Sequence, residues 1–434
     1  MCHDTRDFSP RWGVMMDYFH YQDDQLFCEE VALEQIAQAV GTPFYCYSER
    51  TLLHHLQVFQ QAFASQDSLI CYSVKANSNL AVLDALAKQG AGFDIVSGGE
   101  LERVRRVGCP GERVVFSGVG KSRAEIQAAL AYGVRMFNVE SIPELQRIQE
   151  VALAMDVAAP VTLRINPDVD PKTHPYISTG LKRNKFGIPF GEAVAVYQQA
   201  AQMSHVQVVG LDCHIGSQLT QLSPFVDALK RVMVLIQALK GHGIEIKNLD
   251  LGGGLGIPYE DGDTPPSPAE LAAALLEQLD GMPVTVILEP GRAIVGNAGV
   301  LVTRVEYVKK GEQRHFVITD AGMNDLLRPA IYNAYHGVIP LQRKFDREEQ
   351  VVDVVGPICE TGDFFARDRY LSEVYQGELL AVRSAGAYGF VMSSNYNTRP
   401  RVAEVLVRGD RYAVVRKRES VAQLLENESL FEDA

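Results

Sequence analysis

The chain has 434 residues, of which 47% are hydrophobic and 22% charged, a composition typical of a globular protein with more than one core. Its net charge of −13 disfavours nucleic acid and anionic membranes as partners, and no stretch reaches the roughly 18 apolar residues of a membrane span. The seven cysteines form neither CxxC pairs nor a framework spacing, and the N-terminus lacks the apolar core of a secretory signal. We therefore expect a cytoplasmic protein with free thiols and no bound metal.

The first 42 residues contain a possible strand, Gln25–Cys28, and an amphipathic helix over residues 31–40, which ends at Gly41. A further strand-like run at residues 44–47 is assigned to the lead-in of the next domain. We expect segment 1–42 to contribute to a β domain later in the chain.

Eight short β-prone runs then alternate with helical or mixed segments. The runs cover residues 69–74, 92–96, 113–116, 135–139, 161–165, 208–215, 248–251 and 284–288. Helical patterns between them include residues 80–88, 100–107, 122–132 and 143–152. Continuous apolar strands need helices on both faces, so the pattern predicts an α/β fold with a (β/α)₈ barrel over residues 43–292. An open doubly wound sheet is the alternative, which the lack of a glycine-rich dinucleotide turn after the first strand disfavours.

After Arg292 the strand-like runs follow one another without long helices. They cover residues 299–308, 315–319, 351–355, 378–383, 401–407 and 411–416. The last two flank Gly409-Asp410, which is typical of a hairpin turn. Residues 293–434 are therefore predicted to form a mostly-β second domain.

Lys75 follows the first predicted barrel strand directly. A single lysine at a strand end is usually an ordinary solvated cation. In a parallel barrel, however, the carboxyl ends of all strands meet at one mouth, so Lys75 should lie near the groups that end the other strands. Those groups are Arg164, His214, the Gly252-Gly253-Gly254 turn and Glu289.

These groups suit one cofactor. Backbone N–H groups of a glycine turn can cradle a phosphate, although a triple glycine alone is more often only a tight turn. His214 offers a flat ring and Ser217 a hydroxyl, although a lone histidine is more often a satisfied core residue. With the Lys75 amine and the Glu289 carboxylate they meet the needs of pyridoxal phosphate, whose protonated ring stabilises negative charge on a substrate α-carbon.

Six motifs resemble, in order, those of the diaminopimelate decarboxylase family, whose members are fold-type III pyridoxal-phosphate enzymes. The motifs are Tyr72-Ser73-Val74-Lys75-Ala76-Asn77, His214-Ile215-Gly216-Ser217-Gln218, Gly252-Gly253-Gly254-Leu255-Gly256, Glu289-Pro290-Gly291-Arg292, Gly356-Pro357-Ile358-Cys359-Glu360-Thr361-Gly362-Asp363 and Ala385-Gly386-Ala387-Tyr388. Residues 174–180 and 184–187 resemble the diaminopimelate branch more than the ornithine or arginine branches.

The resemblance implies the cofactor contacts. Lys75 would hold pyridoxal phosphate covalently, His214 would stack on its ring and Glu289 would face the ring nitrogen. The remaining implied cofactor-binding residues are Ser217, Gly254, Pro290, Gly291, Arg292 and Tyr388.

The resemblance also implies the substrate contacts. Cys359 is similar to the family's proton donor, although a small buried thiol is the commoner fate of a cysteine. Arg292, Arg328 and Tyr332 match positions that bind the distal carboxylate of the substrate, although Arg328 could be a surface cation and Tyr332 a packing aromatic. Glu360 matches the position that binds the distal ammonium group, and Tyr388 is shared between cofactor and substrate. The Cys359-Glu360 loop would enter the partner's barrel in an obligate homodimer.

The function implied is that of a lyase that decarboxylates meso-2,6-diaminopimelate to L-lysine and CO₂ in the last step of lysine biosynthesis. One alternative is a decarboxylase of ornithine, arginine or a polyamine precursor, whose distal site would need acids where this chain has Arg292 and Arg328. A non-enzyme alternative is a pyridoxal-phosphate carrier or regulatory relative, which the presence of both Lys75 and Cys359 disfavours. The long loop at residues 168–187 is a candidate lid.

Overall fold

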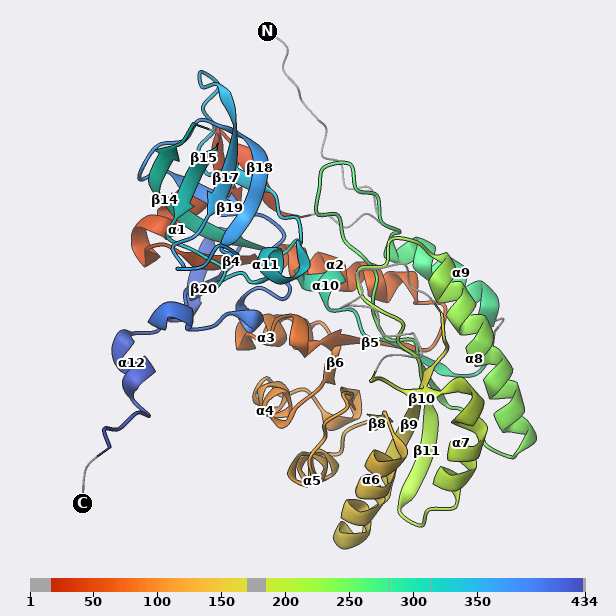
Figure 1. Cartoon of the computed structure of the whole chain (residues 1–434). Helices are drawn as coiled ribbons and strands as arrows, with labels where there is room; N and C mark the ends of the chain where they lie inside the picture. Colours follow the sequence, from red (N-terminus) through yellow and green to blue (C-terminus); the bar gives the residue numbers. More distant parts are fainter. Residues whose placement is uncertain (1–16, 170–184, 280, 313, 432–434) are drawn as a thin grey trace.

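The computed structural model describes residues 17–169, 185–279, 281–312 and 314–431 (Figure 1). The predictions for the first sixteen residues lie outside this part of the chain. So does most of the predicted lid, including residues 174–180 and 184 of the branch motif.

Eight parallel strands close into a barrel, which confirms the predicted fold class. They are β5 (Ser68–Ser73), β6 (Gly92–Ile95), β7 (Val114–Phe116), β8 (Met136–Val139), β9 (Ala159–Asn166), β11 (Val206–Asp212), β12 (Asn248–Asp250) and β13 (Thr285–Leu288). Each strand pairs with the next, and β13 pairs back onto β5 with Val286 opposite Ser68. A short strand, β10 (Ile188–Pro189), extends the edge of β9. The closed order brings the carboxyl ends of all eight strands to one mouth.

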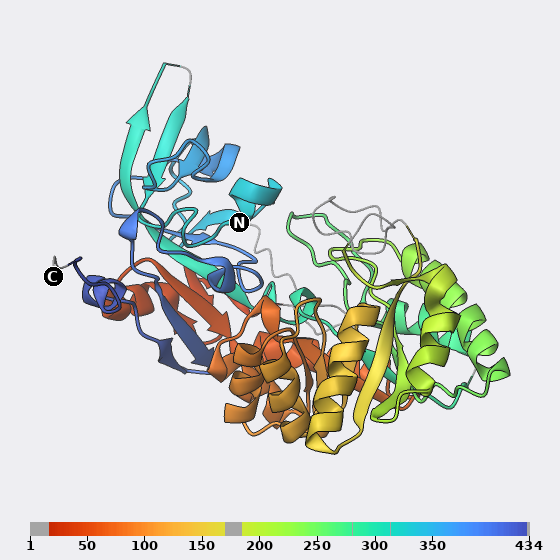
Figure 2. The same cartoon turned by 60° about the horizontal axis from the view of Figure 1, so that its bottom comes forward.

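Eight helices surround the barrel strands (Figure 2). They are α2 (Glu49–Ala62), α3 (Leu80–Lys88), α4 (Gly98–Arg106), α5 (Arg123–Tyr132), α6 (Ile142–Met155), α7 (Ala193–Ala201), α8 (Ser223–Gly241) and α9 (Pro268–Leu279). Short polar side chains begin several of them: Asn79 accepts the N–H of Ala81, and Ser122 forms a capping box with Glu125. The helix starts that the sequence predicted near Asn79 and Ser122 therefore have a local cause.

The second unit is mostly β, as predicted, and is built on the long strand β14 (Gly299–Lys310). Its other strands are β4 (Phe44–Ser48), β15 (His315–Thr319), β16 (Val338–Pro340), β17 (Glu349–Val355), β18 (Phe364–Ser372), β19 (Leu379–Val382), β20 (Ala403–Arg408) and β21 (Arg411–Arg416). The predicted hairpin is β20 with β21. β18 was not predicted, because Arg367, Asp368 and Arg369 interrupt its apolar pattern.

Residues 44–47, which the sequence assigned to the lead-in of the barrel, lie in strand β4 of the second unit. β4 is buried along its whole length and pairs antiparallel with β14 and parallel with β20. Figure 1 shows the red strand β4 between segments from the C-terminal half of the chain. Helix α2 starts directly after it, where the Ser48 hydroxyl accepts the N–H of Thr51. The chain thus passes from the second unit into the barrel at Ser48-Glu49.

The N-terminal segment packs on this second sheet. It forms β1 (Phe19–Gln22), β2 (Gln25–Cys28), β3 (Val31–Ala32) and α1 (Leu33–Val40). Leu26 and Ile36 share a buried apolar cluster with Val300 and Val405.

The remaining short helices complete the described chain. They are α10 (Arg292–Val295), α11 (Arg328–Tyr332), α12 (Val421–Leu425), η1 (Val74–Ala76), η2 (Gly111–Arg113), η4 (Phe190–Glu192), η5 (Phe390–Met392) and η6 (Tyr396–Thr398). Within the described ranges, no helix is long and apolar enough to cross a lipid bilayer.

Candidate active site

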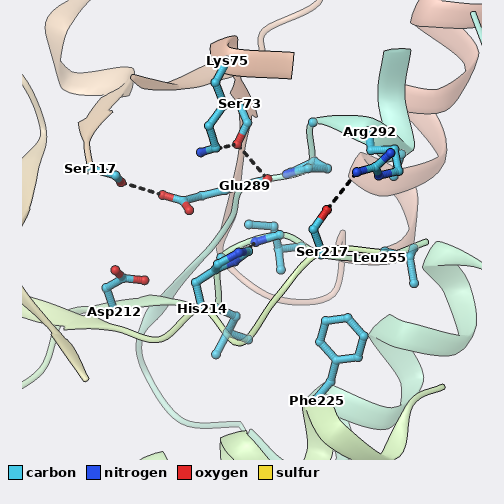
Figure 3. Close-up of a pocket in the computed structure, with 18 of the residues that line it drawn as sticks. Ser73, Lys75, Ser117, Asp212, His214, Ser217, Phe225, Leu255, Glu289 and Arg292 are labelled. Carbon is cyan, nitrogen blue, oxygen red and sulfur yellow. Dashed lines mark hydrogen bonds between the residues drawn. The ribbon is translucent and has the colours of Figure 1, made fainter. Parts of the chain in front are cut away.

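A cavity of about 210 Å³ lies at the carboxyl ends of the barrel strands (Figure 3). Its walls include the segments that follow β5, β11, β12 and β13, residues at the carboxyl ends of β6, β7 and β9, side chains of α2, α8 and α9, and one residue of the second unit. The lining includes every residue that the sequence proposed for cofactor binding: Lys75, His214, Ser217, Gly254, Glu289, Pro290, Gly291, Arg292 and Tyr388. Segments far apart in sequence therefore meet at one place, as the barrel topology requires.

Lys75 lies on η1, immediately after β5. Its Nζ is 2.5 Å from Oδ2 of Asp94 on β6 and 3.3 Å from Oγ of Ser73. Burial lowers the pKa of Lys75, but the charges of Asp94 and Glu289 outweigh it and raise the pKa above its ordinary value. The side chain is still 40% exposed. The amine is therefore charged at neutral pH and open to the cavity.

Glu289 follows β13 and is buried. Its Oε1 accepts hydrogen bonds from Ser117 Oγ at 3.2 Å and from Asn138 Nδ2 at 3.3 Å. Asn138 Nδ2 also lies 3.1 Å from Oδ2 of Asp250. Burial, together with the charges of Asp250 and Asp94, raises the pKa of Glu289 well above its usual range. A cationic group brought next to Glu289 would stabilise its ionised form, which is the environment that a protonated pyridine nitrogen needs.

His214 follows β11, and Figure 3 shows its ring beside Glu289 in the cavity. Its Nδ1 accepts the backbone N–H of Gly253 at 3.2 Å. Burial and the nearby charges of Arg164 and Lys75 lower the pKa of His214 well below its usual value. The imidazole is thus neutral, and its flat face is suited to stacking on an aromatic cofactor ring.

The glycine turn after β12 has no room for side chains. A Cβ at Gly253 would lie 2.2 Å from the carbonyl oxygen of Glu289, and one at Gly254 would lie 2.4 Å from that of Gly216. Gly254 also has a φ of 109°, which side chains disfavour. Beside the turn, Arg292 Nη2 donates to Ser217 Oγ at 3.2 Å. Bare backbone next to a hydroxyl and a guanidinium fits a phosphate group, so the cavity as a whole fits pyridoxal phosphate.

Arg292, which lines the cavity, and Arg328 contact the same aromatic ring. Cζ of Arg292 lies 5.8 Å, and Cζ of Arg328 4.8 Å, from the ring centroid of Tyr259. Arg292 also lies over the ring of Tyr388, at 5.0 Å. Arg328 and Tyr332 are the first and last residues of α11, and neither lines the cavity itself. The residues predicted to bind the distal carboxylate therefore come from both units of the chain.

Cys359 and Glu360 are not brought to the cavity within one chain. Both are exposed on the loop between β17 and β18, and neither belongs to the cavity lining. The N–H of Cys359 donates to Oδ1 of Asn397 at 2.9 Å. The fold thus presents this loop at the surface of the second unit.

Several residues at the site were not proposed from the sequence. They are Ser73, Asp94, Ser117, Asn138 and Tyr259. Ser117 directly follows the predicted strand at residues 113–116, so position alone could have included it. Asp94 and Asn138 lie inside short apolar strands, and only their polarity there signalled a role. Arg164 does line the cavity, but its Nη1 pairs with Oε1 of Glu140 at 2.8 Å.

Comparison with known proteins identifies related enzymes. A family model described as the pyridoxal-binding domain of pyridoxal-dependent decarboxylases matches residues 49–296. Diaminopimelate decarboxylase of Pseudomonas aeruginosa is 57% identical over 415 residues, covering 96% of this chain and 99% of that protein. The corresponding protein of Vibrio cholerae is 56% identical over 417 residues, covering 96% of this chain and 99% of the relative. The crystal structure of diaminopimelate decarboxylase from Helicobacter pylori complexed with L-lysine is 42% identical, with a TM-score of 0.88, and covers 91% of this chain and 98% of that one.

Proposed function

This chain belongs to the diaminopimelate decarboxylase family, and from that premise we propose that it decarboxylates meso-2,6-diaminopimelate to L-lysine and CO₂, the last step of lysine biosynthesis. The observation that carries the proposal is the meeting of the Lys75 amine, the buried Glu289 carboxyl and the Gly252–Gly254 backbone in one cavity. Pyridoxal phosphate is the cofactor, as the family model indicates.

We propose that Lys75 holds the cofactor covalently through its ε-amine. Gly254, Ser217 and the Pro290-Gly291-Arg292 segment bind the phosphate, with Tyr388 beside them. His214 stacks on the ring, and Glu289 keeps the ring nitrogen protonated. In support, all these residues line the cavity, and Glu289 is held in place by Ser117. When bound, the cofactor withdraws electrons from the substrate α-carbon, which permits loss of CO₂.

Two of the chain's own residues would then act in the reaction. The Lys75 amine, held beside Asp94, would be released when the substrate amine replaces it on the cofactor. Cys359 delivers a proton to the α-carbon after CO₂ has left. Support for this role is its exposed thiol on a loop rather than in a core strand.

The distal end of the substrate carries both a carboxylate and an ammonium group. We propose that Arg292, Arg328 and Tyr332 bind the carboxylate and that Glu360 binds the ammonium group. In support, both arginines are buried against Tyr259, where a carboxylate would compensate their charge. A diamine end would instead meet two cations, which disfavours ornithine or arginine as the substrate.

We propose a homodimer in which the Cys359-Glu360 loop of each subunit completes the other subunit's site. The reason is the position of the loop, which lies at the surface and outside the cavity lining of its own chain. A site that needs these two residues is incomplete in a single chain.

We further propose that the barrel domain begins at Glu49 and ends near Gly296, with the N-terminal and C-terminal segments together forming the β domain. The start of α2 and the extent of the family match support these bounds. We place the protein in the cytoplasm, because five buried cysteines and the exposed Cys359 are all free thiols, as is usual in reducing compartments.

The test is product formation by the purified, cofactor-loaded protein, offered meso-diaminopimelate, the LL isomer, ornithine and arginine in parallel. Lysine and CO₂ from the meso compound alone are expected. Preference for ornithine or arginine would show that the distal site has been misassigned, although the Lys75 chemistry would stand. Bound cofactor without turnover of any of the four would point to a carrier instead.

A further inference from the structure

His336 is completely buried directly behind Arg328. Its Nδ1 lies 2.8 Å from the backbone carbonyl oxygen of Arg383, and its Nε2 lies 2.9 Å from Nη1 of Arg328. A carbonyl only accepts and a guanidinium only donates, so Nδ1 must carry the proton and Nε2 must offer its lone pair. Both contacts therefore select the same neutral tautomer.

The surroundings of His336 keep it neutral. Burial lowers the pKa of His336 to about 3, with a further contribution from the adjacent charge of Arg328. Arg292 and Arg369 act in the same direction, and the bond to the Arg383 carbonyl opposes them. A protonated ring would face Arg328 with a second donor and a second positive charge, so only the neutral form can orient this guanidinium.

Tyr259 connects this pair to the second arginine. Its ring meets the His336 ring edge-on, with centroids 5.4 Å apart and planes at 79°. Arg328 lies over the same ring, and Nη1 of Arg292 donates to the Tyr259 hydroxyl. Tyr259 comes from the loop after β12, whereas Arg328 and His336 come from the second unit. The contact thus fixes the two arginines relative to each other across the two units.

The partners of these arginines are uncharged. Among the described residues, Arg328 donates to the His336 ring, and Arg292 donates to the Tyr259 and Ser217 hydroxyls. No carboxylate in the described part of the chain forms an ion pair with either guanidinium. An acidic partner would hold the arginines equally well but would cancel the charge that a substrate carboxylate needs. Neutral acceptors orient the arginines and leave their charge available.

We propose that His336 is a positioning residue that, with Tyr259, orients Arg328 to receive the distal carboxylate of the substrate while leaving its charge uncompensated. The inference rests on the proposed role of Arg328 in substrate binding. It assigns to a buried histidine outside the cavity a function in substrate selection. The hydrogen bond that His336 accepts occupies one of the five N–H donors of Arg328 and leaves the rest of the fork for recognition.

The test compares two amides at this position in the holoenzyme. His336→Gln places an acceptor near the former Nε2, whereas His336→Asn reaches only the former Nδ1 and cannot contact Arg328. We expect the Asn variant to raise the KM for meso-diaminopimelate by roughly 10-fold or more with kcat changed much less, and the Gln variant to recover most of this loss. If the Asn variant does not fold, His336→Phe, which keeps the ring volume without an acceptor, takes its place.

Two inhibitors separate positioning from general damage. L-Lysine keeps the carboxylate of the unreacted end of meso-diaminopimelate, which is the distal one, whereas 1,5-diaminopentane has no carboxylate, so the Asn variant should weaken inhibition by the first and leave that by the second unchanged. Equal weakening of both, or a Gln variant no better than Asn, would overturn the proposal. Arg328→Ala is measured in parallel. If it leaves the preference for the carboxylate-bearing inhibitor intact, the assignment of Arg328 itself fails; if it abolishes that preference while His336→Asn does not, only the role of His336 fails.

Discussion

The Nζ of Lys75 lies 2.5 Å from Oδ2 of Asp94, a carboxylate that is completely closed off from solvent on the neighbouring strand. Asp94 Oδ2 also accepts the Ser73 hydroxyl at 2.7 Å. The ion pair holds the lysine at the barrel mouth and stabilises its protonated form. The free enzyme therefore holds its lysine as a cation, whereas covalent attachment of the cofactor requires a neutral amine.

Replacing Asp94 with Asn should speed attachment of the cofactor. Removing the carboxylate charge lowers the pKa of Lys75, so at a given pH below that pKa the neutral fraction of the amine rises by roughly tenfold or more. The measurement is the rate at which cofactor-free protein gains the absorbance of bound pyridoxal phosphate, as a function of pH. Asp84→Asn is the control, because Asp84 makes an exposed pair with Lys88. If the pH dependence of the attachment rate is the same in Asp94→Asn as in wild type, Asp94 does not control the protonation of Lys75.

Replacing Glu289 with Gln should lower kcat by about 10²-fold while the cofactor stays bound. The amide keeps the size of the side chain and can still accept the Ser117 hydroxyl, but it offers no negative charge to a ring cation. Steady-state rates together with the absorbance of the bound cofactor check this. A fully active Glu289→Gln enzyme would mean that the ring nitrogen is not protonated from this side.

The local patterns predicted the strand ends, and with them much of the cavity. Lys75, His214 and Glu289 each end an apolar run, and the barrel topology alone brings such ends together. Asp94 and Asn138 were not predicted because their roles depend on which strands are neighbours and in what register. Tyr259 was missed for a related reason: its loop has no periodic pattern, and its contacts with Arg328 and His336 come from another part of the chain.

The sequence pattern also does not reveal which unit of the fold a strand joins. Residues 44–48 have a clear strand pattern, but nothing local says that this strand joins β14 and β20 rather than the barrel. The Cys359-Glu360 loop is a comparable case, because a motif identifies its residues but not which subunit's site they would complete.

Subunits that share their active sites should complement each other. Lys75→Ala and Cys359→Ala homodimers should both be nearly inactive, whereas co-expression of the two should restore about a quarter of wild-type activity. The reason is that random pairing makes half of all dimers hybrids, and each hybrid has one intact site out of two. Activity that stays at the level of the two single variants would show that each chain uses its own Cys359.

Replacing Gly253 with Ala should weaken cofactor binding roughly 10-fold or more. The new Cβ would lie 2.2 Å from the carbonyl oxygen of Glu289, so the turn that lines the cavity must shift. Gly241→Ala is the matched control, because a Cβ there has no atom within 4 Å. The measurement is the equilibrium affinity for pyridoxal phosphate. Equal affinities in the two variants would show that the turn does not bind the phosphate.

A buried carboxyl outside the cavity should make stability depend on pH. Asp325 is 1% exposed, and it accepts the N–H of Gly322 at 3.0 Å and the amide of Asn324 at 3.1 Å. Burial raises the pKa of Asp325 to about 7, although the Gly322 hydrogen bond opposes this. The folded state therefore holds this proton more tightly than the unfolded state does.

Ionisation of Asp325 therefore lowers the free energy of unfolding as the pH rises from about 4, the pKa of this carboxyl in the unfolded state, to about 7, its pKa in the folded state. Asp325→Asn can keep an acceptor for Gly322 but does not titrate. Relative to that of wild type, the free energy of unfolding of the variant should therefore rise by on the order of 2 kcal/mol between about pH 5 and about pH 8. Denaturant unfolding of the two proteins at both pH values checks this, with the exposed Asp410→Asn as control. A difference between variant and wild type that is the same at both pH values would mean that Asp325 is ionised throughout this range and that its hydrogen bonds fully compensate its burial.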